Sequence, residues 1–172
     1  MRFFSFLLSV FIFTGCVSKQ DFPSSWEKID TNKSTECSNI VGVYQNKGQI
    51  ESSEYSPLLS EYLFTDIEKS DFIEISKNND TFYMKAYLEE NLISEKSFDI
   101  NSKSISCKDG FWLIHKDKSH NDGGVLAKEW DSFNLTKNKD GLIIKKVNNA
   151  LGLFFLIPVI GHDTSWVLFK NK

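Results

Sequence analysis

Short runs of alternating apolar and polar residues, separated by Asn, Asp and Gly, dominate the chain after residue 39. The clearest run spans residues 81–88, where Phe82, Met84 and Ala86 occupy one set of alternate positions and Tyr83 and Lys85 occupy the other. Because successive side chains of a strand point to opposite faces, this pattern predicts a strand with one buried and one largely solvated face.

Turn signals divide the other strands that this pattern predicts. Asn78-Asn79-Asp80 precedes the clearest run, so residues 71–76 and 81–88 are predicted to form a hairpin. Asn138-Lys139-Asp140-Gly141 is a second turn signal, between the strands predicted at residues 132–137 and 142–147. The remaining strands are predicted at residues 41–45, 93–100, 111–115 and 165–169.

One segment departs from the β pattern. Ser56 can cap a helix and Pro57 suits the first helical position. The apolar residues that follow with helical spacing are Leu58, Leu59, Tyr62 and Leu63. This segment predicts a short amphipathic helix whose leucine face covers one end of a curved sheet.

Eight or nine short strands and one helix indicate a mainly β fold, an antiparallel meander that is either closed as a barrel or folded as a two-layer sandwich. Gly42-Val43-Tyr44 in the first predicted strand resembles the Gly-x-Trp motif of lipocalins, with tyrosine in place of tryptophan. The resemblance implies a lipocalin-like barrel, which we expect here, and it assigns no ligand. The sandwich stays open as the alternative.

The first sixteen residues have the layout of a secretory signal: Arg2, an apolar run over residues 3–13, and Thr14-Gly15-Cys16. This ending resembles the lipobox of bacterial lipoproteins, with Phe13 where an aliphatic residue is usual. The resemblance implies that residues 1–15 are removed and that Cys16 becomes a lipidated N-terminus. Ordinary cleavage after Ser18 is the alternative. A retained span is not expected, because the run rises only about 16 Å as a helix against a membrane core of about 30 Å.

The segment after the signal is polar and weakly periodic, so residues 16–38 are predicted to be a flexible tether and residues 39–172 a single β-rich domain. Trp26 lies inside the tether, and we expect it to dock onto the domain. Val17 follows Cys16 where inner-membrane lipoproteins carry Asp, which resembles the members sorted to the outer membrane. The expected location is therefore the periplasmic side of a Gram-negative outer membrane.

Composition and charge exclude some partners. Once Arg2 is removed with the signal, 19 lysines stand against 23 acidic residues, a formal net charge of −4. The lysines are scattered, and the exported chain has no arginine fork to grip phosphate. We therefore expect no nucleic-acid partner.

Three cysteines, Cys16, Cys37 and Cys107, are an odd number for an exported protein. If Cys16 is lipidated, Cys37 and Cys107 are left as a pair, which the oxidising periplasm allows to form a disulfide. Two free buried thiols are the alternative.

Candidate metal ligands gather between residues 115 and 122. The side chains that could bind a divalent ion are His115, Asp117, His120 and Asp122. Their spacing matches no zinc or calcium pattern, and the lysines between them repel a cation. We therefore expect a solvated loop with no metal and no cofactor.

Catalytic motifs are not found. His162 and Asp163 are neighbours in sequence, so their side chains do not face each other as a catalytic dyad requires. The chain contains no Gly-x-Ser-x-Gly elbow, zincin helix or phosphate-binding glycine loop. We expect a protein that is not an enzyme.

The apolar stretch over residues 150–160 is the most unusual part of the predicted domain. Pro158 would interrupt a central strand, and the stretch is too short to span a bilayer as a helix. One interpretation is a buried strand that leads through a turn at residues 161–164 into the last strand. The other is an exposed apolar surface, carried by Phe154, Phe155 and Leu156, that contacts membrane, a partner or an apolar ligand.

The expected function is therefore that of a non-enzymatic envelope lipoprotein that scaffolds or binds an envelope partner. A lipocalin-like carrier or sensor of an apolar small molecule is the alternative. The two differ in one structural property, because a carrier needs a cavity whereas the core of a scaffold is filled.

Overall fold

The computed structural model describes residues 17–29, 36–64, 67, 69–118, 120–122, 125–154 and 157–172; for residues 120–122, 125–127, 153, 154, 157 and 159 this description covers the backbone. In chain order the elements are β1 (Val17–Lys19), β2 (Gly42–Gln45), α1 (Leu59–Leu63), β3 (Phe72–Asn78), β4 (Thr81–Leu88), β5 (Asn91–Asp99), β6 (Ile105–Lys108), β7 (Phe111–Asp117), β8 (His120–Asp122), β9 (Val125–Lys137), β10 (Gly141–Phe154) and β11 (Ile157–Lys170).

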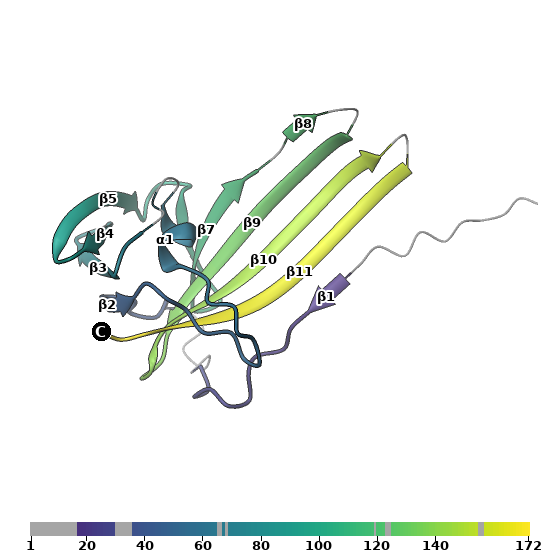
Figure 1. Ribbon diagram of the computed structural model, residues 1–172. Coiled ribbons are helices and arrows are strands. Elements are labelled where there is room, and N and C mark those ends of the chain that lie inside the picture. Colours follow the sequence, from purple (N-terminus) through teal and green to yellow (C-terminus); the bar gives the residue numbers. More distant parts are fainter. Residues whose placement is uncertain are drawn as a thin grey trace, which may run out of the picture.

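The strands form two sheets (Figure 1). The larger has the order β1-β11-β10-β9-β7-β6, with β8 paired to β9, and the smaller has the order β2-β3-β4-β5. All pairings are antiparallel except that of β1 with β11. The mainly β, antiparallel fold with one short helix is as predicted. Among the described residues neither sheet is closed, so the expected barrel is wrong and the arrangement is consistent with the sandwich.

The predicted hairpin is confirmed. Strands β3 and β4 pair from Phe72 opposite Tyr87 to Asn78 opposite Thr81, and Asn79 adopts a left-handed φ of 51° in the turn. The alternation over residues 81–88 has the expected meaning, because Phe82, Met84 and Ala86 are all buried. This face of β4 contributes to the main core.

The main core lies between the two sheets and under α1. Leu59, Tyr62 and Leu63 of the helix are buried in it, with Tyr62 packed edge-on against Phe133 of β9 at 5.2 Å between ring centroids. The helix begins two residues later than Pro57 predicts, and its N-cap residue Leu58 supplies no side-chain hydrogen bond. Instead, Asn46 accepts hydrogen bonds from the backbone N–H groups of Leu59 and Ser60, both at 2.8 Å. A contact from a distant strand end thus replaces the local cap.

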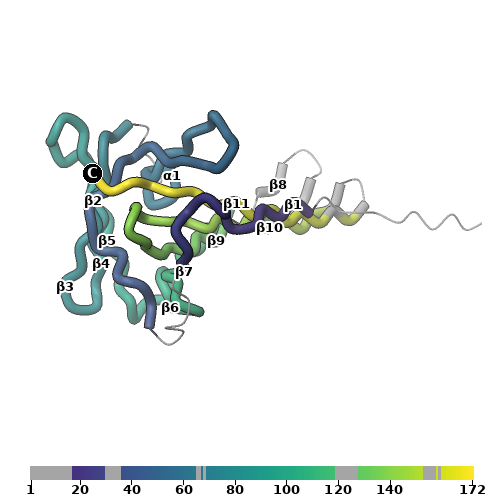
Figure 2. The backbone as a smooth tube through the Cα atoms, turned by 90° about the horizontal axis from the view of Figure 1, so that it is seen from below, coloured from purple at the N-terminus to yellow at the C-terminus, as the bar shows by residue number. Residues whose placement is uncertain are grey.

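Strands β9, β10 and β11 are 13, 14 and 14 residues long, much longer than the sequence pattern predicts. Their far ends project from the two-sheet body as a narrow arm (Figure 2). We call this arm the blade and define it as residues 125–131, 148–154 and 157–163. The predicted turn at residues 161–164 is wrong, because these residues are part of β11 and pair with residues of β10.

Residues 17–29 lie against the larger sheet, although the sequence predicts a flexible tether there. Strand β1 pairs with β11, and Phe22, Trp26 and Ile29 pack on a second cluster formed by Ile143, Trp166 and Leu168. The expected docking of Trp26 is confirmed. Alternation along residues 17–29 is too weak to predict this, since the contacts are made to strands about 140 residues away.

Candidate functional site

The structure does not bring the predicted metal ligands together within the residues that it describes. His115 is exposed on β7, and its Nδ1 lies 2.9 Å from the Ser132 hydroxyl. His120 and Asp122 belong to β8, and their side chains are outside the described part of the chain. Within the described residues, no three His, Cys, Asp or Glu side chains are grouped so that they could hold a metal ion.

His162 lies on β11 and takes part in a polar row across the blade. Its Nδ1 is 2.8 Å from the Asn149 side-chain oxygen, and its Nε2 is 3.4 Å from the Thr164 hydroxyl. Asp163 occupies the next position along the strand and therefore the opposite face. The two side chains do not form the hydrogen-bonded base and carboxylate that a hydrolase needs.

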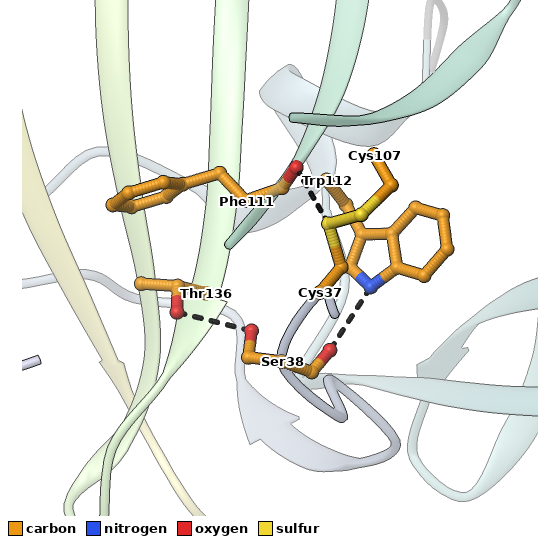
Figure 3. Close-up of a disulfide and its surroundings, with 6 residues drawn as sticks. All are labelled: Cys37, Ser38, Cys107, Phe111, Trp112 and Thr136. Carbon is orange, nitrogen blue, oxygen red and sulfur yellow. Dashed lines mark hydrogen bonds between the residues drawn. A yellow bond between two sulfur atoms is a disulfide. The ribbon is translucent and has the colours of Figure 1, made fainter. Parts of the chain in front are cut away.

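Cys37 and Cys107 form a disulfide, with 5.7 Å between their Cα atoms (Figure 3). The Cys37 sulfur is 3.0 Å from the Phe111 carbonyl oxygen; because a disulfide sulfur carries no proton, we describe this as a close contact. Next to it, the Trp112 indole N–H donates a hydrogen bond to the Ser38 carbonyl at 2.9 Å, and the Thr136 hydroxyl bonds the Ser38 hydroxyl at 3.0 Å. The bridge and these bonds fix the chain just before β2 to β6, β7 and β9.

A buried charge network lies where the blade leaves the body. Asp131 of β9 is only 1% exposed and contacts Lys118 at 2.7 Å and Lys146 at 3.9 Å. Asn148 donates hydrogen bonds from its amide to Asp131 and to Glu129, both at 2.8 Å. Burial opposes ionisation of Asp131, but the hydrogen bonds from Lys118 and Asn148 and the nearby Lys146 outweigh it and lower the pKa of this carboxyl. Its charge is satisfied internally, so the network stabilises the base of the blade.

Lys116 joins the same region to the helix. Its ammonium group donates hydrogen bonds to the carbonyl oxygens of Glu61 and Phe64, both at 2.9 Å. Burial, together with the like charges of Lys96 and Lys118, lowers the pKa of Lys116 to about 8. The lysine caps the C-terminal end of α1, which is a structural role.

The Asp131 network was not predicted from the sequence. Asp131 is opposite Asn148, and Glu129 and Lys146 each lie two residues away along their own strands, diagonally across from this pair. That spacing is the only sign of the network in the sequence. Which residues of β9 and β10 are opposite each other is known only from the structure.

Residue type changes along the blade in rows of three paired residues. The rows nearest the body are polar: Asp131, Asn148 and Asp163, then Trp130, Asn149 and His162. The next two rows are mixed, because Glu129 pairs with Ala150 and Lys128 pairs with Leu151. Beyond them the residue types are apolar in all three strands, and we call residues 125–127, 150–154 and 157–160 the blade tip. Within it Leu151 is 50% exposed and Ile160 is 61% exposed. Leu151 and Ile160, which are opposite each other on neighbouring strands, therefore form an exposed apolar patch.

The sequence assigned such a surface to Phe154, Phe155 and Leu156. Phe154 ends β10 and its side chain is outside the described residues, as are Phe155 and Leu156 altogether. The described residues on either side, Leu151 and Ile160, are exposed, so the alternative of a buried strand does not hold for them.

The N-terminal strand runs along the edge of the blade. Val17 is opposite His162 and Lys19 is opposite Thr164, in parallel. Because the pairing is parallel and β11 runs from the tip toward the body, Val17 is the end of β1 nearer the tip. Val17 itself is 69% exposed. Cys16, where we expect the lipid, lies outside the described residues. It directly precedes Val17 in the sequence, and Val17 is held at the edge of the blade.

Three comparisons with known proteins were made for the chain. No family model, curated protein or solved structure matches it. Among the described residues there is also no helix with the length and apolar character needed to cross a membrane. Any functional conclusion therefore depends on the geometry of this chain alone.

The hollows that the structure describes lie at the surface of the sheets. One of about 350 Å³ lies over β6, β7, β9, β10 and β11. It is lined by Lys108, Asp109, Phe111, Leu113, Asn134, Lys145 and Trp166. A second, of about 390 Å³, includes Glu27, Ser38 and Lys139 in its lining. Charged and amide side chains make both poor sites for an apolar ligand.

Proposed function

We propose that this protein is a lipid-anchored envelope protein, bound through Cys16 to the periplasmic face of the outer membrane, with a non-enzymatic β domain that scaffolds or binds an envelope partner. The observation that carries the proposal is the position of Val17, the first described residue. Strand β1 holds Val17 opposite His162 at the edge of the blade, so an anchor on the preceding residue would be attached near the exposed Leu151 and Ile160.

Two further features support the proposal. The resemblance of Thr14-Gly15-Cys16 to a lipobox gives Cys16 a role, and the disulfide accounts for both other cysteines. Packing of residues 17–29 against the sheet means that the domain would stand close to the bilayer in a fixed orientation. A flexible tether of the predicted length would allow many orientations.

The alternative of an apolar-ligand carrier has less support. The core between the sheets is filled by large side chains, including Tyr44, Phe82 and Phe169, each no more than 2% exposed. The described hollows lie outside that core, and charged side chains contribute to the lining of each. A scaffold needs no internal cavity, so the scaffold interpretation is favoured.

Intact mass spectrometry tests the anchor. The chain is expressed with its own signal in a Gram-negative host and extracted from membranes without reduction. We expect a mass for residues 16–172 plus acyl chains, lowered by the two hydrogens lost in the disulfide. The Cys16→Ala variant should lose the acyl mass, whereas the matched Cys37→Ala/Cys107→Ala variant should keep it. An unmodified wild-type mass that begins downstream of Cys16 would refute the anchor.

A further inference from the structure

We infer that the hollow of about 350 Å³ on the outer face of the larger sheet is a binding site for an acidic saccharide, that is, a sugar that carries a carboxylate. The inference goes beyond the proposed function, because it gives the domain a ligand of stated chemistry. It does not depend on the lipid anchor, since every residue that it uses lies in the described body of the protein.

Four neighbouring strands supply the floor of the hollow in a single row. Leu113 of β7 is opposite Asn134 of β9. Asn134 is opposite Lys145 of β10, which in turn is opposite Trp166 of β11. Paired residues of neighbouring strands point to the same side of a sheet, so these side chains share one face. The alternate positions of the same strands belong to the main core, so the row lies on the outer face.

The wall on the side of β6 is held in place by the disulfide. Lys108 and Phe111, which are opposite each other at the end of the β6–β7 hairpin, both line the hollow. The bridged Cys107 directly precedes Lys108, and Figure 3 shows the bridge close to the Phe111 backbone. In the turn of the hairpin, the Ser38 N–H donates a hydrogen bond to the Gly110 carbonyl at 3.2 Å. This wall is fixed before a ligand arrives, which lowers the cost of binding.

The wall on the side of β11 is fixed by the docked N-terminal segment. Phe22 packs edge-on against Trp166 with 5.0 Å between ring centroids, and the Trp166 indole donates a hydrogen bond to the Gln20 carbonyl at 3.1 Å. Phe111 of the opposite wall packs on the cluster that contains Trp166. The two walls therefore belong to one packed unit, as in the pre-formed pockets that bind small molecules.

Two lysines stand on opposite sides of the hollow. Strands β6 and β10, which carry Lys108 and Lys145, are three strand spacings apart, about 14 Å. The Lys145 ammonium group lies 5.3 Å from the Trp166 ring centre, and the ion pairs that the structure describes involve other lysines. With Asp109 at the rim, two positive charges and one negative charge give the lining a net charge of +1, in a chain of net charge −3. The lining therefore favours an anion.

Between the lysines the floor is apolar and offers an acceptor. Phe111 and Leu113 are half-buried, so part of each side chain faces the hollow. Asn134 donates a hydrogen bond from its amide to the Lys145 carbonyl at 3.2 Å, and among the described residues no donor reaches its side-chain oxygen. A sugar ring matches this floor, because its C–H face can cover Phe111 and Leu113 while a hydroxyl donates to Asn134.

Other small ligands would use only part of this lining. An apolar molecule would displace water from Lys108 and Lys145 without giving them a partner. A bare inorganic anion would leave the apolar floor unused. A planar aromatic acid would use the lysines and the floor but would leave Asn134 and Asp109 without a donor. A sugar that carries a carboxylate supplies all three kinds of contact.

The other described hollows do not combine these features. The one of about 390 Å³ has no apolar side chain in its lining. A third, of about 330 Å³, has Lys47 and Lys69 in its lining together with two leucines, but no aromatic ring. This third hollow provides a matched control, since it too has two lysines.

Calorimetric titration of the chain without its lipid tests the inference. The chain from Val17 to Lys172, which contains every residue described here, is exported behind a signal that is cleaved without lipidation. The ligands are trigalacturonic acid and N-acetylmuramic acid, with N-acetylglucosamine as the neutral match of the second. We expect at least one of the two acids to bind at least tenfold more tightly than N-acetylglucosamine. Its Kd should rise with added salt, because the attraction is partly between charges.

Two double variants locate the binding. Lys108→Met/Lys145→Met keeps the apolar stems and removes both charges, so we expect the Kd of the acidic saccharide to rise at least tenfold. Lys47→Met/Lys69→Met makes the same change at the third hollow and should leave the Kd within twofold of the parent value. Near-UV circular dichroism checks that both variants keep the parent fold.

The remaining outcomes would each overturn the inference. They are no binding of either acid, equal binding of N-acetylglucosamine, and an unchanged Kd in Lys108→Met/Lys145→Met. Equal binding of phosphate would make the hollow a simple anion site, and equal binding of benzoate would make it a site for aromatic acids. None of these results bears on the acyl mass of the native chain, so this inference and the proposed anchor can fail separately.

Discussion

Asp131 is a carboxylate whose environment differs greatly from that of the same side chain in water. It is buried at the base of the blade, yet Lys118, Lys146 and Asn148 keep it ionised. A carboxyl whose pKa is lower in the folded than in the unfolded chain stabilises the fold above the unfolded-state pKa of about 4. That contribution is lost as the pH falls through the lower, folded-state value.

The Asp131→Asn variant tests this network. We expect its free energy of unfolding at pH 7 to be about 2 kcal/mol below that of the parent, because charged hydrogen bonds to Lys118 and Asn148 are lost or weakened. The difference should shrink as the pH falls below about 4. Urea unfolding at pH 7 and pH 3 measures both.

Asp163→Asn is the matched control, since Asp163 is exposed and lies in the same row. It should change the free energy of unfolding by no more than about 0.5 kcal/mol. A pH-independent loss in Asp131→Asn would mean that packing, not charge, holds Asp131.

At the scale of elements, the N-terminal segment is attached to the larger sheet by a few aromatic contacts. Phe22 packs edge-on against Trp166 with 5.0 Å between ring centroids, and Gln20 N–H donates a hydrogen bond to the Thr164 carbonyl at 3.1 Å. The Trp166 indole donates to the Gln20 carbonyl at 3.1 Å. These contacts decide whether residues 17–29 are held rigidly against the sheet.

The Phe22→Ala variant should detach this segment locally. We expect the exchange protection of Gln20 N–H to fall by about 2 kcal/mol, a value below that for a fully buried Phe because Phe22 is only half-buried. Protection within β3 and β4 should be unchanged. Native-state hydrogen exchange measures both, and Ser24→Ala, on an exposed residue of the same segment, is the control. Equal loss of protection in all strands would contradict local detachment.

At the scale of the whole molecule, the disulfide connects the chain just before β2, in the smaller sheet, with β6 at the edge of the larger one. It closes a loop between residues 70 apart in sequence. In the chain-entropy description, such a crosslink limits the unfolded ensemble and stabilises the fold by about 4 kcal/mol.

The Cys37→Ala/Cys107→Ala variant is therefore expected to lose about 4 kcal/mol of unfolding free energy in urea. The parent chain unfolded in dithiothreitol should show the same loss, while the variant should not respond to the reductant. Equal stability of the oxidised parent and the variant would show that strain or residual structure offsets the constraint.

Much of the body could be predicted from sequence because its strands are half-buried. Alternation at residues 81–88 and the turn at Asn79 follow from strand geometry, and the pairing of Cys37 with Cys107 follows from an odd cysteine count. The barrel was a wrong expectation, since alternation fixes which face of a strand is buried but not whether the last strand meets the first.

The tertiary structure alone decided the blade and the position of residues 17–29. The apolar run at residues 150–160 has the same composition whether it is buried in its own domain or exposed, as Leu151 and Ile160 are. Likewise, the polar segment before residue 29 gives no local sign of its parallel pairing with residues 162–164. The sequence determined the local strand, turn and cysteine chemistry because these depend on near neighbours and parity. What each strand is packed against depends on contacts between residues far apart in the chain, which only the folded molecule specifies.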